Sequence, residues 1–305
     1  MDFILGDNSR YNFDYYIDKG FYWSVGINSK YLGFKNFIKP SSLITEGVYP
    51  DIDKIQMNFS EFTHQFFAET LIQKDLALKI GVELKDLKIT TNDNVFLTYF
   101  DTSEYKIEDG EFYSLFGSLK IDLIDNKFFP KSGFLFEGGL KFYFASSNFS
   151  DDFNELSVFK TQISKAFKIS NKFALNINTE GGFKIGNNDT KALLFGLGGY
   201  GHNYFNNYST LYGYDYFSLS GNSYVKIAST LDYEFINNHH FNFSTNFANI
   251  GNDIFLNSDW IDSLFYGGYS VGYGLETIFG PVEVKYNWSG SSNESGFYIN
   301  VGYWF

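Results

Sequence analysis

Apolar and polar residues alternate along most of this chain, and this period of two restricts its fold more than any other feature. In residues 225–235, Val225 and Leu231 share one face, whereas Lys226 and Asp232 share the other. Successive side chains of a β-strand point to opposite faces, so each such segment is a strand with one apolar and one polar face. The same alternation recurs at 76–84, 113–123, 134–144, 282–288 and 297–305. No segment of useful length keeps the helical period of 3.6, so the chain is predicted to be all-β.

The connections between these segments are alternately short and long. Short turns are expected at 18–20, 73–75, 126–133, 170–172, 237–239 and 280–281. Longer polar loops are expected at about 37–55, 93–110, 147–155, 187–222, 252–266 and 289–296. This order is typical of a transmembrane barrel, with tight turns in the periplasm and long loops outside. A soluble β-sandwich, the alternative fold, would have shorter strands and no such rule for its loops.

The composition fits strands that separate hydrocarbon from water. Aromatic residues make up 21% of the chain, yet the mean hydropathy is only −0.20. An apolar outer face combined with a polar inner face accounts for both values. No window holds 18 uninterrupted apolar residues, which excludes a transmembrane helix. We therefore predict an antiparallel transmembrane β-barrel in the bacterial outer membrane, in contact with its lipids.

The Cys count, the net charge and the placement of two histidines exclude several kinds of site and one kind of partner. The chain has no Cys, so it forms neither disulfides nor thiolate metal sites. Its net charge of −12 argues against nucleic acid as a partner, because phosphate binding needs clustered Lys and Arg. His239 and His240 are adjacent in a predicted turn and point to opposite sides if extended, so we predict no metal site there.

About thirteen strands can be counted, which is an odd number. They are expected at 9–18, 20–36, 57–73, 76–92, 112–125, 133–146, 156–169, 172–186, 222–237, 240–251, 267–280, 281–289 and 296–305. Bacterial single-chain barrels normally have an even number of strands, so the opening strands are expected to be missing. The start, MDFILGDNSRYNF, also lacks the basic region and apolar core of a secretory signal. We therefore expect residues 1–305 to be the barrel domain at the C-terminus of a longer protein.

One long segment resembles a known family. The stretch FGLGGYGHNYFNNYSTLYGYDYFSLSGNSYVKIASTLDYEF looks like loop six and the following strand of the BamA/TamA/FhaC superfamily, also called bacterial surface antigen barrels. Leu211-Tyr212-Gly213-Tyr214 takes the place of the loop tip, Gly221-Asn222 matches the start of the strand, and Leu231-Asp232-Tyr233-Glu234 matches its end. DNKFFPKSG, at 125–133, resembles the family's Phe-Pro-x-x-Gly periplasmic turn.

The resemblance implies a barrel of sixteen strands, of which this chain covers strands four to sixteen. It implies that loop 187–222 folds toward the lumen, with Tyr212, Gly213 and Tyr214 at its tip. Face parity makes four carboxylates candidate partners for the two tyrosines: Asp232, Glu234, Glu276 and Glu283. The alternative is an extracellular loop that is merely aromatic. Tyr303 and Phe305 would form a C-terminal signal for the barrel-assembly machinery during insertion.

One departure from the family pattern concerns the tip. Tyr212 replaces the family's arginine, and a tyrosine cannot make the charge-assisted fork that an arginine makes. This weakens a role in polypeptide translocation or insertion. It favours similarity to the C-terminal barrels of patatin-like lipid hydrolases from Bacteroidota, in which an N-terminal patatin domain does the chemistry and the barrel is the anchor. A patatin domain or a periplasmic domain is then expected upstream.

Two motifs look catalytic. Gly268-Tyr269-Ser270-Val271-Gly272 matches G-x-S-x-G, but that motif needs a strand, a strained turn and a helix, and here it begins an alternating strand. Gly196 to Gly201 matches G-x-G-x-x-G, but no helix follows to hold a pyrophosphate. We therefore predict no catalytic residue, metal or cofactor in this chain. Three alternatives to the anchor stay open: a lipid hydrolase that uses Ser270, an insertion or translocation pore of the BamA/TamA type, and a passive porin.

Overall fold

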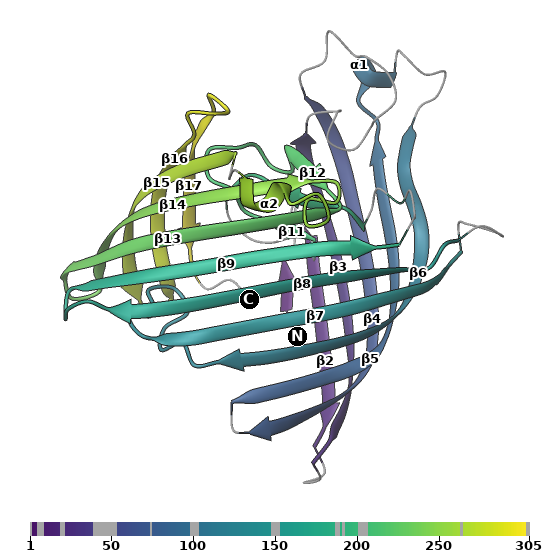
Figure 1. Cartoon of the computed structure of the whole chain (residues 1–305), viewed down its shortest axis with the longest axis horizontal. Coiled ribbons are helices and arrows are strands. Elements are labelled where there is room, and N and C mark those ends of the chain that lie inside the picture. The colour runs from purple at the N-terminus through teal and green to yellow at the C-terminus, as the bar shows by residue number, and fades with distance from the viewer. Residues whose placement is uncertain are drawn as a thin grey trace. The chain divides into compact units, whose positions relative to one another are not determined.

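The structure is a computed structural model that consists mainly of long antiparallel strands (Figure 1). It describes residues 2–4, 9–18, 22–38, 54–73, 75–97, 104–147, 153–186, 190, 193–200, 207–262 and 265–302. The predicted C-terminal signal residues Tyr303 and Phe305 lie outside the described residues.

Each of the thirteen predicted strands is present. They are β2 (Ser9–Ile17), β3 (Ser24–Ile38), β4 (Ile55–Gln73), β5 (Leu76–Thr91), β6 (Tyr105–Asp122), β7 (Gly133–Ser146), β8 (Leu156–Lys168), β9 (Phe173–Ile185), β13 (Ser223–Ile236), β14 (His239–Gly251), β15 (Tyr266–Thr277), β16 (Gly280–Trp288) and β17 (Ser295–Val301). With β1 (Asp2–Ile4), these thirteen strands follow chain order in one fourteen-stranded sheet.

The differences from the predicted strands have local causes. β1 was not predicted, because three residues are too few to show an alternation. β6 begins at Tyr105 instead of residue 112, because the charged run YKIEDG was interpreted as loop. The predicted loop 187–222 contains three short strands, β10 (Phe195–Leu197), β11 (Tyr208–Ser209) and β12 (Leu219–Gly221), which form a small separate sheet. The alternation could not predict these either, since each has two or three residues.

Two short helices lie in the connections, α1 (Asn94–Leu97) and α2 (Asp259–Asp262). Among the described residues, neither these nor any other helix has the length and apolar character needed to cross a membrane.

The chain divides into two compact units. Unit 1 comprises residues 1–119, 138–159 and 184–194, and unit 2 comprises 120–137, 160–183 and 195–305. In unit 1 the register of β4 and β5 runs from Met57↔Thr91 to Gln73↔Leu76. In unit 2 the register of β13 and β14 runs from Ser223↔Gly251 to Ile236↔His239. Each ladder has one irregularity, next to its short turn, between Leu71 and Gln73 in the first and between Glu234 and Ile236 in the second. The regular part of each ladder fixes which side chains share a face, because a slip of one residue would exchange the two faces.

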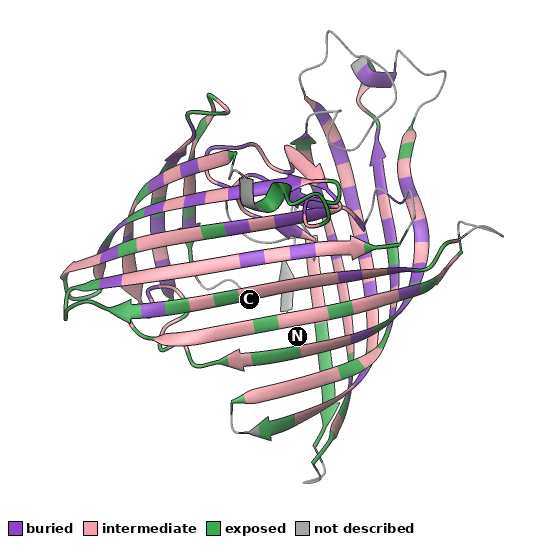
Figure 2. Ribbon diagram, viewed as in Figure 1, coloured by how far each residue is buried: buried purple, intermediate pink, exposed green. Residues whose placement is uncertain are grey.

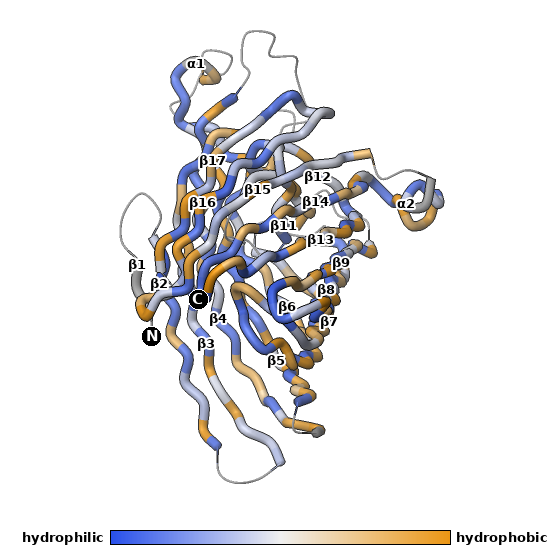
Figure 3. The backbone as a smooth tube through the Cα atoms, turned by 90° about the vertical axis from the view of Figure 1, so that its left-hand side faces the viewer, coloured by the Kyte–Doolittle hydropathy of each residue, from blue (hydrophilic) through white to orange (hydrophobic). Residues whose placement is uncertain are grey.

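The strands of unit 2 expose their apolar face and bury their polar face. On β13, Ile227 and Leu231 are each 40% exposed, whereas Lys226 and Asp232 are each 3% exposed. The same inversion continues on its neighbours, as the alternating colours in Figures 2 and 3 show. Its exposed apolar side chains include Phe241, Phe243, Val271, Val284, Tyr286, Phe297 and Ile299. A soluble protein buries such residues, so this arrangement requires a hydrocarbon environment outside and a polar environment inside.

Unit 1 exposes apolar residues in the same way, but part of its buried face is apolar. Phe66, Ile80 and Val82 are exposed. The buried face carries charges near the middle of the strands, where Lys85 lies 3.3 Å from Glu61 and Lys141 lies 2.6 Å from Glu83. Toward the long connections that face becomes apolar, with buried Ile38, Ile55, Met57, Leu87 and Ile89.

Candidate functional site

A stripe of small residues on β15 is the centre of the candidate site, which lies in unit 2. Gly268, Ser270, Gly272 and Gly274 occupy the inner face of this strand. A side chain on Gly268 would begin 1.8 Å from the carbonyl oxygen of Tyr212, and one on Gly274 would begin 2.5 Å from the ring of Phe129. The glycines therefore let two segments approach the strand closely, one from the long loop and one from a short turn.

The loop tip is the first of these segments. The Gly213 amide donates a hydrogen bond of 3.0 Å to the Asn287 side chain of β16, and the Ser292 hydroxyl donates to the Gly213 carbonyl. Gly213 has φ +71°, and a Cβ there would lie 2.1 Å from the backbone of Trp288. Only glycine combines this conformation with this proximity.

Both tip tyrosines contact another aromatic ring, and Tyr212 also contacts a hydroxyl. The ring of Tyr212 stacks on Tyr200 with centroids 5.0 Å apart, and its hydroxyl contacts the Ser244 side chain of β14. Burial raises the pKa of the Tyr200 and Tyr212 phenols, so both of these stay protonated at neutral pH. Tyr214 is buried, and its ring meets Tyr266 edge-on at 6.0 Å.

A buried cluster of charges holds the stem of the same loop. Lys226 of β13 lies 2.7 Å from Glu180 of β9. The Ser209 hydroxyl of β11 donates a hydrogen bond to Glu180 and accepts one from Lys226. The Lys226 ammonium also donates to the Thr210 carbonyl at 3.1 Å, and the Lys160 ammonium of β8 donates to the Tyr208 carbonyl at 3.1 Å. The positive charges that bind the loop thus come from the wall, and the loop supplies backbone carbonyls.

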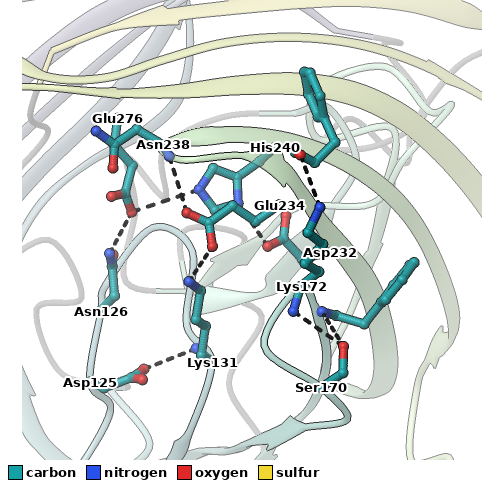
Figure 4. Close-up of polar contacts among 12 residues, drawn as sticks. Asp125, Asn126, Lys131, Ser170, Lys172, Asp232, Glu234, Asn238, His240 and Glu276 are labelled. Carbon is teal, nitrogen blue, oxygen red and sulfur yellow. Dashed lines mark hydrogen bonds and ion pairs between the residues drawn. The ribbon is translucent and has the colours of Figure 1, made fainter.

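The second segment is the turn at 123–132, between β6 and β7 (Figure 4). Asp125 accepts backbone N–H bonds from Lys131 and Ser132, each at 3.0 Å. The Asn126 amide donates to Glu276 of β15 at 2.7 Å, and the Lys131 ammonium donates to Glu234 of β13 at 2.5 Å. The hydrogen bond to Glu234 raises the pKa of Lys131. These contacts bind the turn to the inner face.

The ring of Phe129 completes the contact of the turn. It stacks on His240 with centroids 4.1 Å apart, and His240 Nδ1 lies 2.8 Å from Asp232. His240 Nε2 lies 4.0 Å from the Glu276 carboxylate. The other histidine of the predicted turn, His239, contacts the Tyr273 hydroxyl through Nδ1 at 2.6 Å.

The four predicted carboxylates lie on the inner face, but their described bonds go to wall and turn residues instead of the tip tyrosines. Asp232 contacts His240, Glu234 contacts Lys131, Glu276 contacts Asn126, and Glu283 contacts Lys285. Face parity places a side chain on the correct side of a strand, but it does not choose its partner. Sequence reasoning missed Glu180, which stands between Thr179 and Gly181, and Lys160, which stands before Thr161. Neither has an apolar neighbour on both sides as Lys226 does, so the alternation around them is weak.

A cavity of about 550 Å³ lies among these groups. Its lining includes Tyr212 from the loop tip and Phe129 from the turn, with Asn178, Thr230 and Asp232 on the wall. In the part of the chain that the structure describes, the side-chain carbonyl of Asn178 and one carboxylate oxygen of Asp232 have no hydrogen-bond partner. The cavity is therefore polar and suited to water or a polar chain.

The G-x-S-x-G motif is part of a strand, as the sequence predicted. Ser270 lies within β15, which continues to Thr277 and pairs with β16, so no strained turn and helix follow the serine. Its hydroxyl is buried and has no hydrogen-bond partner among the described residues. In the second motif, Gly196 and Leu197 belong to β10, and Gly201 lies outside the described residues.

Comparisons with known proteins support one family. The family model described as the OMP85 superfamily matches residues 1–305. BamA from Haemophilus ducreyi lacking POTRA domains 1-3 has a similar structure, with TM-score 0.68 and 14% identity over 97% of this chain and 62% of that chain. CdiB from Acinetobacter baumannii is also similar, with TM-score 0.59 and 12% identity over 97% of this chain and 50% of that chain.

CdiB from Escherichia coli is a third similar structure, with TM-score 0.56 and 10% identity over 92% of this chain and 49% of that chain. No curated protein matches the chain. The chain thus spans less than two thirds of the length of each of these three solved structures.

Proposed function

The chain belongs to the OMP85 superfamily, and from this premise we propose that it is the membrane anchor and translocation unit of a longer protein. The predicted antiparallel transmembrane β-barrel fold, the location in the bacterial outer membrane and the membership of the BamA-type superfamily are confirmed. The anchor is proposed to have no chemistry of its own.

The observation that carries the proposal is the seating of the loop tip on β15 and β16. The tip is fixed by the Gly213–Asn287 bond, and the loop stem by the buried Lys226–Glu180 pair. A loop fixed at both places obstructs the polar face that a passive pore would keep open. The resting state is thus expected to be closed, as an anchor or a gated path requires.

More specifically, we propose that the chain is the C-terminal barrel of a patatin-like parent protein. The support is the resemblance of the loop and turn segments to the C-terminal barrels of patatin-like proteins, together with Tyr212 at the tip. The parent would supply the hydrolase, and this chain would hold it at the membrane. Insertion by the barrel-assembly machinery remains a prediction that belongs to the same proposal.

A gated translocation or insertion path is the second candidate function. The polar cavity of about 550 Å³ between the loop tip and the turn favours it, because such a space could admit an extended chain once the loop is released. This candidate differs from the anchor in requiring the loop to move during function.

Conductance in planar bilayers tests the closed resting state. We expect the purified chain to give little steady current, and a variant in which a short Gly-Ser linker replaces residues 210–218 to give a larger one. A large steady current from the wild-type chain would contradict the proposal and favour a passive porin. If the parent protein without the loop stays in membranes but no longer transfers its substrate, the gated path is favoured over the anchor.

The parent protein is tested separately. Antibodies against residues 207–222 should isolate a protein much larger than 35.0 kDa from outer membranes, with lipid hydrolase activity. The Ser270→Ala change in that protein should leave the activity unchanged. A mass near 35.0 kDa would eliminate the patatin-like parent without affecting the conductance result.

A further inference from the structure

A second concavity lies in unit 1, on the outward face of its strands. It has a volume of about 510 Å³ and is lined by β3, β4 and β5. Two rows of paired residues form its floor: Gly33, Ser60 and Lys88 in one, and Lys35, Asn58 and Thr90 in the other. We call this concavity the outer pocket. The residues of these two rows have the parity of the exposed Ile27, Phe66 and Val82, so the outer pocket opens away from the inner face.

The position of the outer pocket along the strands places it at the level of lipid headgroups. The apolar outward residues Ile27, Phe66 and Val82 lie toward the short turns. Next come three aromatic rings: the centroid of Phe62 lies 6.3 Å from that of Tyr31 and 4.2 Å from that of His64. Aromatic side chains of this kind mark the membrane–water interface of outer-membrane barrels. The outer pocket lies beyond them, toward the long connections, which is the outer side of the membrane.

The chemistry of the outer pocket suits a phosphate attached to a polar sugar. Lys35 and Lys88 line it at diagonal corners, and among the described residues neither has an ion-pair partner within 4.0 Å. Strand spacing puts their Cα atoms about 12 Å apart, close enough for both ammonium groups to reach one phosphate. Asn58 and Ser60 add hydrogen-bonding groups between them. Two acidic groups are near, Glu104 in the lining and Asp86 beside Lys88.

Gly33 leaves room for the phenol of Tyr31 at the edge of the outer pocket. Its missing side chain would begin 2.6 Å from the Tyr31 hydroxyl, so this phenol covers one wall of the outer pocket. The backbone of Gly33 is extended within β3, and a larger residue could replace it if the mobile end of Tyr31 moved. A larger side chain at position 33 would therefore displace this phenol and narrow the outer pocket.

We propose that the outer pocket binds the phosphorylated sugar headgroup of a glycolipid in the outer leaflet, with Lys35 and Lys88 holding the phosphate. The location in the outer membrane supplies the ligand, because phosphorylated glycolipid forms that leaflet. The proposal is independent of the function of the loop, so the conductance experiment does not bear on it.

The test measures binding of diphosphoryl lipid A to the purified full chain in detergent by native mass spectrometry. Near a charged membrane surface each lysine contributes a severalfold factor in affinity, so Lys35→Gln with Lys88→Gln should weaken binding by on the order of tenfold or more. Lys168→Gln with Lys172→Gln, at the short-turn end of β8 and β9, is the matched control and should bind as the wild type does.

Two further experiments test whether the form of the outer pocket matters and which phosphate compound it binds. Gly33→Leu fills the outer pocket without a change in charge and should weaken binding at least severalfold, which keeps the test valid if the lysine variant folds poorly. Inorganic phosphate at millimolar concentration and phosphatidylglycerol should not displace the lipid A. Unchanged binding in both pocket variants, or displacement by phosphatidylglycerol at equal concentration, would overturn the proposal.

Discussion

At the residue scale, the positive charge that joins loop and wall lies on the wall, whereas the family resemblance implies that it lies on the loop. A tip arginine would bring charge from the loop to the wall. Here Tyr212 contacts a hydroxyl and a ring, and the buried charge comes from Lys226 and Lys160 of the wall. Wall lysines are fixed by strand backbone on both sides, so they lose less freedom on binding than a side chain on a loop would.

The Lys226→Met variant tests this exchange. Glu180 would keep its negative charge in a buried place without its main partner, so we expect a loss of about 3–5 kcal/mol of unfolding free energy. Urea unfolding in detergent micelles, followed by tryptophan fluorescence, measures it. The double variant Lys226→Met with Glu180→Gln should recover a large part of the loss. Equal stability of the single and double variants would contradict the buried ion pair.

Gly213→Ala tests the seating of the tip. A Cβ in this left-handed conformation costs about 1–2 kcal/mol, and the approach to Trp288 adds to that. We expect limited proteolysis to cut residues 207–218 several times faster in this variant. Gly290→Ala is the control, because nothing lies within 4 Å of the position where its Cβ would be. Equal cutting of the two variants would show that the tip is not seated.

At the element scale, β15 carries a function that its strand pattern does not suggest. Gly268 accepts the loop tip, and Gly274 accepts Phe129 of the turn. A strand with large residues at these places would keep its ladder but exclude both segments. The turn at 123–132 then depends on its own polar bonds, above all those of Asp125.

The turn is expected to respond to acid through Asp125. Partial burial opposes the charged form, but hydrogen bonds from Ser132 and Lys131 prevail, so the pKa of Asp125 lies below its ordinary value. A carboxyl with a lowered pKa stabilises the folded state above its ordinary pKa of about 4, and the contribution is lost as the pH falls through the folded value.

Asp125→Asn should therefore cost about 1 kcal/mol at pH 7, discounted for the exposure of the side chain. Below about pH 3 its stability should approach that of the wild type. Urea unfolding between pH 2.5 and 7 measures the difference between the two proteins. A difference that does not change with pH would contradict the role of the charge.

The opposite sign applies to Lys131. Its pKa is raised by the bond to Glu234, so its contribution is complete below about pH 10 and is lost at higher pH.

At the scale of the whole molecule, apolar side chains face outward in each of the two units, and charged and polar side chains face inward in unit 2 and near the middle of the strands in unit 1. This inversion decides where a charge can be added. Leu231 and Thr230 are neighbours on β13 with opposite faces, and Thr230 lines the inner cavity.

Leu231→Lys should destabilise the chain in lipid bilayers by about 2–4 kcal/mol, as expected for a lysine on the lipid face near mid-membrane. Thr230→Lys, placed in the polar cavity beside Asp232, should cost less than about 1.5 kcal/mol, mainly the lost bond to Ser244. Urea unfolding from bilayers measures both variants. A larger loss for Thr230→Lys would show that the two faces have been exchanged.

The sequence by itself determined the strands and their faces, because alternation is a local property that each strand carries in its own residues. It also placed Asp232 and Glu283 on the inner face. Only the tertiary structure decided which partners meet: Lys226 with Glu180, Phe129 with His240, and Tyr212 with Ser244. Partner choice depends on the register and relative height of segments far apart in the chain, and face parity does not contain that information.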